Sequence, residues 1–315
     1  MFLETLSHAV LALFSREVLS ASVTQSDVIK EYPAIIEQSF IPAGSARLKL
    51  AAERPREPKK VVEDSYGVIT QSKSVIVTDL ASGATIFSKN PDAERSIGSI
   101  TKLLTALVFL EKNPDLQLEE KITWFDYVEG GREYVKVGEK LKVADILGAS
   151  LVGSDNMATL HLSGETKEER ADFVERMNSK ARELGLSHTR VVDPVGLESD
   201  NVSTARDLSV LLSTALAHPT IAQYIVKDSL ALTVGAETVE VLSTNELISM
   251  SSGQEYRVLG GKTGYIPEAG YCLAAAVESR GNKIIIVVLG APEKEQRFTD
   301  VQNLALWTFK TFSWD

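Results

Sequence analysis

A serine and a lysine that could act as nucleophile and base stand three residues apart in the stretch ERSIGSITKLLTALVFLE, residues 94–111. Residues i and i+3 of a helix share one face, so Lys102 could reach the hydroxyl of Ser99. A lysine acts as a base only when it is neutral, and burial or a nearby cation would lower its pKa enough for this. The backbone N–H of Ser99 would lie at the positive end of the helix, where an oxyanion is stabilised.

The same spacing has a plainer interpretation, in which Ser99 caps the helix and Lys102 is solvated. A Ser-x-x-Lys pattern is expected about once or twice by chance in a chain of this composition. The pair therefore needs support from elsewhere in the sequence.

A Ser-Asp-Asn triplet occurs twice and could supply a second serine together with an amide. The copy at residues 154–156 joins apolar, helix-like segments on both sides, so we expect a rigidly held loop in which Ser154 and Asn156 serve a site. The copy at residues 199–201 lies in the polar stretch GLESDN and is predicted to be a surface turn. We therefore favour the first copy.

A third group lies in GGKTGYIPEAGYCL, where Lys262 stands at the end of a predicted strand with glycines on both sides. The tripeptide Lys-Thr-Gly is expected only about one tenth of a time by chance. Because glycines let another backbone approach closely, a strand edge with Thr263, Gly264 and Tyr265 could pair with an extended peptide. The N–H of Tyr265 could be a second oxyanion donor. Taken alone, the stretch would be interpreted as a Gly-rich turn with a solvated lysine.

The elements that would position these groups place strand-like segments at both ends of the domain and helices between them. Residues 74–80 and 84–88 flank the turn ASG and predict a hairpin, and residues 271–291 predict another around SRGN. Apolar residues at helical spacing predict a largely buried helix after Ile100. Further segments are predicted to be helical at 142–164, 166–187, 203–219 and 300–312. This order favours one three-layer α/β domain, an antiparallel sheet flanked by helices with a mostly helical insertion.

The composition of the chain excludes several classes of function. A length of 315 residues with 44% hydrophobic residues suffices for a substantial core. The formal net charge of -10 argues against a nucleic-acid binder. The single cysteine, Cys272, excludes an internal disulfide and lies in an apolar run, which predicts a buried structural thiol. The histidines show no metal-site spacing, so we expect no metal and no other cofactor; they are His8, His161, His188 and His218.

The first 65 residues are expected to precede the folded domain. Residues 5–15 form an apolar run that is too short to span a bilayer and lacks the basic flank of a signal peptide, although small residues follow it. A signal or anchor segment in residues 1–25 and a short amphipathic helix are equally supported. Residues 26–65 are rich in proline and charge and are expected to form a linker or extended arm before a domain at 66–315.

The three motifs, in this order, resemble those of the penicillin-recognising serine enzymes. From about Tyr66 to Phe312 the chain is similar to the low-molecular-mass penicillin-binding proteins, a family of D-alanyl-D-alanine carboxypeptidases and DD-endopeptidases. The stretches MNSKARELGLSHTRVVDPVGLESDNVSTARDLSVLL and KTGYIPEAGYCLAAA look like the family's segment before its third motif and its third-motif strand. The resemblance implies a β-lactamase/transpeptidase-like fold and a serine-type D-Ala-D-Ala carboxypeptidase that acts on peptidoglycan stem peptides, with β-lactams as covalent inhibitors.

The resemblance also implies a role for each motif residue. Ser99 would be the acylated nucleophile with Lys102 as its general base, and Ser154 would relay a proton to the leaving group. The resemblance further implies that Asn156 would help to hold the substrate amide.

Three further residues would bind the substrate's charged end. Lys262 would supply positive potential and Thr263 would bind the substrate carboxylate. Arg297 falls where carboxypeptidases of this type carry an arginine for the terminal carboxylate, although an exposed arginine at a helix start explains that residue equally well.

Other functions on the same motifs are less well supported. A DD-endopeptidase would cut cross-links by the same chemistry. The sequence around DPVGLESDNVSTARDL looks closer to the endopeptidases of the family than to its anchored carboxypeptidases. A serine β-lactamase of one class needs a glutamate to activate water, and Glu198 lies in roughly that region but without the expected Asn partner. A non-catalytic wall-binding module would be expected to lose Ser99 or Lys102, and both are present.

The resemblance also bears on location. The chain stops at Asp315 without the C-terminal β-domain and anchor found in many family carboxypeptidases, so any membrane attachment is expected through the N-terminal segment. Peptidoglycan lies outside the cytoplasmic membrane, and this predicts an extracytoplasmic enzyme in the periplasm or cell envelope.

Overall fold

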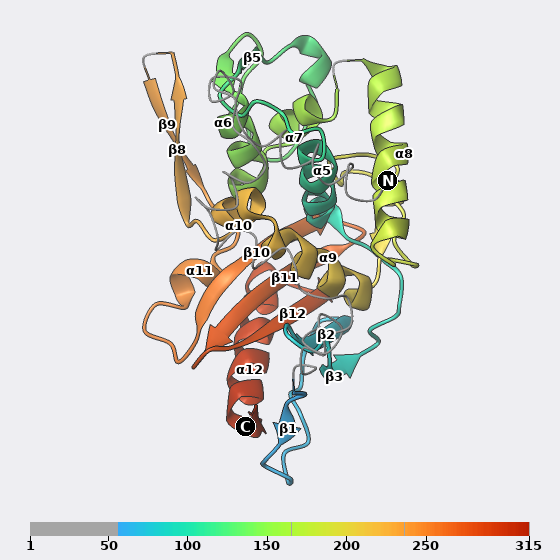
Figure 1. Cartoon of the computed structure of the whole chain (residues 1–315), viewed down its shortest axis with the longest axis vertical. Coiled ribbons are helices and arrows are strands. Elements are labelled where there is room, and N and C mark those ends of the chain that lie inside the picture. Colours follow the sequence, from blue (N-terminus) through green and yellow to red (C-terminus); the bar gives the residue numbers. More distant parts are fainter. Residues whose placement is uncertain (1–55, 165, 236, 315) are drawn as a thin grey trace, which may run out of the picture. The chain divides into compact units, whose positions relative to one another are not determined.

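The computed structural model describes residues 56–164, 166–235 and 237–314, which belong to one compact unit. A five-stranded antiparallel sheet with the order β10-β11-β12-β2-β3 forms its centre (Figure 1). Segments from the two ends of the domain thus pair with each other in the sheet, as the sequence order predicted. The strands are β2 (Ser74–Asp79), β3 (Thr85–Lys89), β10 (Arg257–Ile266), β11 (Gly270–Ser279) and β12 (Asn282–Ala291).

Both faces of the sheet are covered because alternate side chains of a strand point to opposite faces. Val75 and Val77 of β2 belong to a core that is closed by helix α12 (Lys294–Thr311). Ile76, between them, belongs to a larger core that includes helices α5 (Thr101–Leu110) and α9 (Ala205–Ala217). This is the predicted antiparallel sheet flanked by helices, and the fold class is confirmed.

The helical insertion lies above the sheet in Figure 1 and carries α5, α6, α7 and α8. Thr166 begins α8 with a capping box that it forms with Glu169, as a Ser or Thr three residues before Glu predicts. The other helices are α6 (Val143–Gly148), α7 (Asn156–Leu162), α8 (Lys167–Glu183), α10 (Pro219–Ile225) and α11 (Leu247–Met250). Short turns are η1 (Gly98–Ile100), η2 (Trp124–Asp126) and the π-helical η3 (Ala149–Gly153).

Four two-stranded sheets complete the unit. The β8–β9 hairpin at the upper left of Figure 1 was not predicted. The paired strands are β1 (Lys59–Lys60) with β13 (Phe312–Ser313), β4 (Arg95–Ser96) with β7 (Val202–Ser203), β5 (Glu119–Lys121) with β6 (Lys140–Lys142), and β8 (Ser229–Val234) with β9 (Glu237–Leu242).

Three differences from the predicted elements bear on the site. The helical segment at 142–164 is interrupted at Ser154, which takes a left-handed backbone conformation with φ 62°. Helix α12 begins at Lys294, six residues before the predicted start, because charged residues in its first turns hid the helical pattern. Strand β10 continues to Ile266, so Lys262 lies within the strand and not at its end.

The predicted N-terminal segments lie mostly outside the described residues. The signal or anchor segment predicted at residues 1–25 falls wholly there, and so does His8. Within the predicted linker at 26–65, β1 pairs with β13, so this part of the chain lies against the domain. Among the residues that the structure describes, no helix combines the length and the apolar character that crossing a membrane requires.

Candidate active site

Ser99 and Lys102 lie at the junction of η1 and α5, as the Ser-x-x-Lys spacing predicted. The Nζ atom of Lys102 is 3.0 Å from the Oγ atom of Ser99. The lysine side chain is fully buried, and its amine is also 2.8 Å from Asn156 Oδ1 and 2.8 Å from the carbonyl oxygen of Val195. The solvated-lysine interpretation is therefore wrong, because the lysine side chain is fully buried and its amine is bonded to these three protein groups.

The surroundings of Lys102 suit a neutral amine. Burial lowers its pKa from the ordinary lysine value to about 7, against the opposing charges of Asp193 and Asp155. A neutral amine donates two hydrogen bonds and accepts one. In the structure the amine donates to two carbonyl-type oxygens and to Ser99 Oγ, and when the amine is neutral the Ser99 hydroxyl can instead donate to its lone pair. Burial, which was expected to act together with a nearby cation, is the main cause of the lowered pKa.

The carbonyl of Val195 is presented by a loop that is wound around Asp193. The Asp193 carboxylate accepts from the backbone N–H groups of Val195 and Gly196 at 2.6 Å each, from Glu198 at 2.9 Å and from Leu197 at 3.5 Å. Such a carboxylate fixes several consecutive peptide groups at once. Thr105 donates to the carbonyl of Pro194 at 2.5 Å and ties the same loop to α5.

The second Ser-Asp-Asn copy supports this loop from inside the protein. Ser199 and Asp200 are exposed, as predicted for a surface turn, but Asn201 is fully buried. The Asn201 amide accepts from the N–H of Val192 at 2.7 Å and donates to the carbonyl of Asp193 at 2.8 Å. The surface-turn prediction is therefore wrong for Asn201. Its neighbours in the sequence are polar, so nothing in the local pattern indicated that its side chain is buried.

The first Ser-Asp-Asn copy is held rigidly between η3 and α7. The buried Asp155 caps α7 by accepting from the N–H of Ala158 at 2.9 Å, and it also accepts from the N–H groups of Tyr134 at 2.6 Å and Val135 at 3.1 Å. Asn156 donates to the carbonyl of Gly130 at 2.8 Å while its Oδ1 faces Lys102. Asp155 and Asn156 thus hold the loop at residues 130–135 against the site.

Strand β10 closes the site from the sheet side and is an edge strand, so its outer backbone edge has no partner strand in the sheet. Lys262 Nζ donates to Ser154 Oγ at 2.8 Å, and Thr263 Oγ1 donates to Thr244 Oγ1 at 2.6 Å. Burial and the charges of Lys102, Arg297 and Arg132 lower the pKa of Lys262 well below that of a free lysine. The structure thus brings all three motifs together.

The turn that carries Ser99 packs backbone to backbone against β10. Gly98 has φ 53°, and a Cβ atom on it would lie 2.7 Å from the backbone nitrogen of Tyr265. A Cβ atom on Gly264 would lie 2.1 Å from the carbonyl oxygen of Ile97. Only glycine fits such an approach. This packing places the turn that carries Ser99 directly beside the backbone of Tyr265.

Arg297 lies behind this strand, in the first turns of α12. It is 5% exposed, so the expectation of an exposed helix-start arginine is wrong. Its Nη1 atom is 3.4 Å from the carbonyl oxygen of Gly264, and its guanidinium carbon is 5.5 Å from the centre of the Tyr271 ring. Burial lowers the pKa of Arg297 to about 10, and its Nε has no hydrogen-bond partner among the described residues.

Sequence reasoning missed several residues that complete the site. Asp155 and Asp193 were given no role by the sequence analysis. The signal for Asp155 was its position between Ser154 and Asn156 in the triplet, whereas Asp193 stands six residues before the second triplet and had no comparable signal. Thr244 and Arg132 carried no such signal, because only the fold brings their loops to β10. The buried thiol of Cys272 was predicted correctly, and its burial raises its pKa to about 11.

Comparison with known proteins agrees with this geometry. Residues 60–293 match the family described as D-alanyl-D-alanine carboxypeptidase. The D-alanyl-D-alanine endopeptidase of Pseudomonas aeruginosa is 35% identical over 240 residues, 75% of this chain and 76% of that protein. The Streptomyces K15 DD-transpeptidase has a TM-score of 0.72 at 27% identity, over 78% of this chain and 100% of that one.

A structure with a bound β-lactam is also similar. Penicillin-binding protein D2 from Listeria monocytogenes, in its cefotaxime-bound form, has a TM-score of 0.67 at 29% identity, over 77% of this chain and 98% of that one. Because the family match covers most of the chain and the fold agrees, this protein belongs to the D-alanyl-D-alanine carboxypeptidase family of serine peptidases.

Proposed function

We propose that this enzyme removes the terminal D-alanine of peptidoglycan stem peptides through an acyl-enzyme on Ser99, in a catalytic domain at residues 66–315. The family establishes the carboxypeptidase activity; the assignment of residues to steps is our proposal. The observation that carries it is the fully buried Lys102 amine, 3.0 Å from the Ser99 hydroxyl and bonded otherwise only to two acceptors.

Acylation begins when the neutral amine of Lys102 takes the proton of Ser99 Oγ. The oxygen attacks the carbonyl carbon of the penultimate D-alanine, and the carbonyl oxygen becomes an oxyanion. The N–H groups of Ser99 and Tyr265 donate to that oxyanion, which supplies charge stabilisation where it develops. Asn156 lies beside the amine with its side-chain amide and orients the substrate amide.

Departure of the leaving group needs a proton on its nitrogen. Ser154 Oγ gives this proton as the C–N bond breaks, and Ser154 recovers it from the Lys262 ammonium, 2.8 Å away. Before deacylation, the Lys102 ammonium releases its proton to solvent and Lys262 regains a proton from solvent. Water then attacks the ester carbonyl, the neutral Lys102 amine accepts the water proton, and Lys102 returns this proton to Ser99 Oγ as the ester C–O bond breaks. After one cycle the protonation states are again those of the free enzyme for all four groups, Ser99, Ser154, Lys102 and Lys262.

The substrate is proposed to lie along the free edge of β10 as an added strand. Gly264 leaves room for its backbone, and Thr263 offers a hydroxyl to the terminal carboxylate. Arg297 adds positive potential from behind the strand, through the peptide group of Gly264 that its guanidinium contacts. A β-lactam would enter the same place and acylate Ser99, as the bound β-lactam in the related Listeria structure supports.

The substrate implies action outside the cytoplasm, in the periplasm or cell envelope. Peptidoglycan lies there, and enzymes of this family act on it. We propose the N-terminal segment as the site of any attachment to a membrane.

A second candidate activity is cleavage of peptidoglycan cross-links. The 35% identical relative from Pseudomonas aeruginosa is named an endopeptidase, and this favours the candidate. The chemistry is the same, because only the group on the leaving nitrogen differs. A β-lactamase role is not supported, since the required glutamate, Glu198, is exposed on its loop and contributes a backbone N–H to Asp193.

The test compares two soluble substrates with the purified enzyme and with Ser99→Ala. A monomeric pentapeptide reports the release of D-alanine, and a cross-linked muropeptide dimer reports conversion to monomers. Release of D-alanine at the higher kcat/KM supports the carboxypeptidase, and faster dimer cleavage supports the endopeptidase. If Ser99→Ala cleaves either substrate as fast as the native enzyme, the assignment of the nucleophile is wrong.

A further inference from the structure

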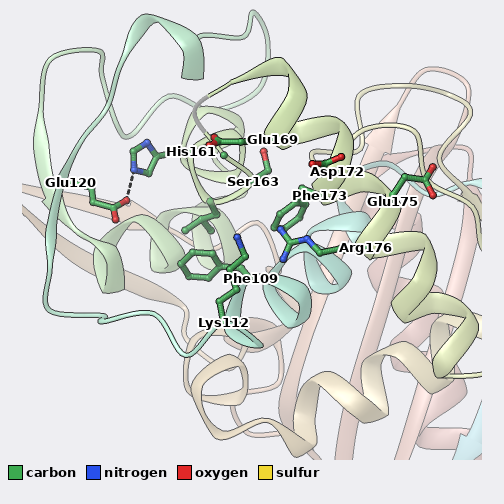
Figure 2. Close-up of a pocket in the computed structure, with 12 residues that line it drawn as sticks. Phe109, Lys112, Glu120, His161, Ser163, Glu169, Asp172, Phe173, Glu175 and Arg176 are labelled. Carbon is green, nitrogen blue, oxygen red and sulfur yellow. Dashed lines mark hydrogen bonds and ion pairs between the residues drawn. The ribbon is translucent and has the colours of Figure 1, made fainter.

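A pocket with a volume of about 730 Å³ lies at the end of α5 that is remote from Ser99. Figure 2 shows Phe109 and Lys112 at this end of α5, facing Phe173 and Arg176 of α8. At a rise of about 1.5 Å per residue, the ten residues of α5 separate the pocket from the nucleophile by about 15 Å. The pocket therefore plays no part in bond cleavage, but its size is that of ordinary small-molecule sites.

The lining of the pocket is polar, with charges of both signs next to one another. The pocket is lined by four carboxylates and two cations, which Figure 2 draws around the rings of Phe109 and Phe173. These charged groups are Glu120, Glu169, Asp172, Glu175, Lys112 and Arg176. Because the carboxylates outnumber the cations, the lining disfavours an anionic ligand, and its many hydrogen-bonding groups suit a neutral ligand with hydroxyl and amide groups. The floor is formed by the partly exposed Phe109 and by Phe173, with the Arg176 guanidinium 4.9 Å from the Phe173 ring centre.

A turn with exposed aromatic side chains lies next to this pocket. Within the described chain five aromatic side chains are exposed, and three of them stand in one four-residue stretch, Trp124 at 77%, Phe125 at 66% and Tyr127 at 53%. The other two are Tyr66 and Tyr265. Large exposed apolar groups gathered at one place generally mark a binding surface.

The turn is rigid because the residue between these aromatic rings points inward. Asp126 is fully buried, and its carboxylate accepts from the N–H of Thr123 at 2.8 Å and contacts Arg170 at 3.0 Å. His161 joins the turn to the pocket wall, with Nδ1 3.0 Å from Asp126 and Nε2 2.7 Å from Glu120. These bonds fix the backbone that carries the aromatic rings, so binding at the turn costs little backbone freedom.

We propose that the pocket and the aromatic turn together bind the glycan chain of the polymeric substrate. N-acetylated sugars are neutral, carry hydroxyl and amide groups that suit interleaved charges, and have apolar ring faces that stack on Trp124 and Phe125. The proposal rests on the proposed function, since it names a second part of the same polymer. An anionic membrane surface fits less well, because the protein has a net charge of -10 and the pocket wall carries four carboxylates.

The test measures binding by calorimetry and catalysis by D-alanine release. The binding probes are neutral glycan strands, namely oligomers of β-1,4-linked N-acetylglucosamine, and phosphatidylglycerol vesicles. The substrates are a soluble pentapeptide and insoluble sacculi. The variants are Trp124→Ala/Phe125→Ala in the turn and Asp172→Ala/Arg176→Ala in the pocket. The control is Tyr66→Ala, which removes an exposed aromatic ring that is not part of this surface.

We expect each double variant to bind glycan strands about tenfold more weakly and to process sacculi correspondingly more slowly. Pentapeptide turnover and acylation by benzylpenicillin should stay at native rates, and Tyr66→Ala should behave as the native protein. Native binding of glycan strands by both double variants, or no binding by the native protein, overturns the proposal. So does loss of binding only to phosphatidylglycerol vesicles, which would indicate a membrane surface. Loss of penicillin acylation in the native enzyme would instead refute the proposed function.

Discussion

The amine of Lys102 is 3.0 Å from the hydroxyl of Ser99, and every other bond it makes goes to an acceptor. Asn156 brings one acceptor from α7, and Val195 brings the other from the loop after α8. Two distant parts of the chain therefore set the direction of the lone pair that faces Ser99. This relationship leads to predictions about pH, about the loop and about the packing beneath the nucleophile.

Acylation should follow the protonation of Lys102. Burial lowers its pKa to about 7, so the amine is neutral above that pH and charged below it. The second-order rate constant for acylation by benzylpenicillin should therefore rise from pH 5 to pH 7, by about tenfold per pH unit well below the pKa, and then level off. Stopped-flow or mass-spectrometric rates over pH 5–9 measure this, and a flat profile would refute the role of base.

Asp193 should act as a positioning residue for this lysine. Asp193→Asn removes a negative charge that raises the pKa of Lys102, so the acidic limb of the pH profile should move to lower pH. It also weakens the bonds that hold the Val195 carbonyl, and the plateau rate should fall about tenfold. The control is Asp200→Asn, which changes an exposed carboxylate in the same loop. If the plateau rate of acylation falls but the acidic limb of the pH profile does not move, Asp193 supports the loop and does not affect the pKa of Lys102.

The glycine beneath the nucleophile should tolerate no side chain. Gly98→Ala places a Cβ atom 2.7 Å from the nitrogen of Tyr265 and should lower the free energy of unfolding by about 3 kcal/mol, with slower acylation. The control, Gly83→Ala, shares the left-handed backbone with φ 73° but meets no atom within 4 Å. It should lower that free energy by only about 1 kcal/mol. Urea unfolding measures both variants. An equal loss of unfolding free energy in Gly98→Ala and Gly83→Ala would mean that the close approach of Gly98 to β10 does not affect stability.

His161 should stabilise the helical insertion most strongly at acidic to neutral pH. Burial opposes its charge, but Asp126 and Glu120 outweigh burial and raise the pKa of His161. Its stabilisation is therefore fully present below the unfolded-state value of 6.5 and is lost as the pH rises through the raised folded-state value. His161→Ala should lower the free energy of unfolding by about 2 kcal/mol at pH 6, and by less at pH 9.

The control for His161 is the exposed His188, which is 3.3 Å from Glu94. His188→Ala should lower the free energy of unfolding by less than about 0.5 kcal/mol at either pH. An effect of His161→Ala that did not diminish toward pH 9 would show that packing, and not charge, holds the network together.

Much of the fold and of the site could be predicted because local pattern and motif agreed. Alternating and helical periodicities predicted both hairpins and the buried helix after Ile100, and the spacing of Ser99 and Lys102 predicted their contact. A rigidly held loop at residues 154–156 was expected, but the left-handed backbone of Ser154 was not. It could not be predicted, because the groups that hold Asp155, the N–H groups of Tyr134 and Val135, belong to a loop about 20 residues away in the sequence. The burial of Asn201 and Arg297 could not be predicted either. Burial is predicted from the periodicity of apolar residues, and a polar residue that the fold buries does not contribute to that periodicity.

The most direct test is intact-mass analysis of the purified protein after brief incubation with benzylpenicillin, followed by peptide mapping, with Ser99→Ala and Lys102→Ala alongside. The account predicts one covalent adduct that maps to Ser99 and persists for minutes or longer. It also predicts that the adduct is absent from Ser99→Ala and forms far more slowly in Lys102→Ala. An adduct on another residue, or native-rate acylation of Lys102→Ala, would contradict the assignment of nucleophile and base.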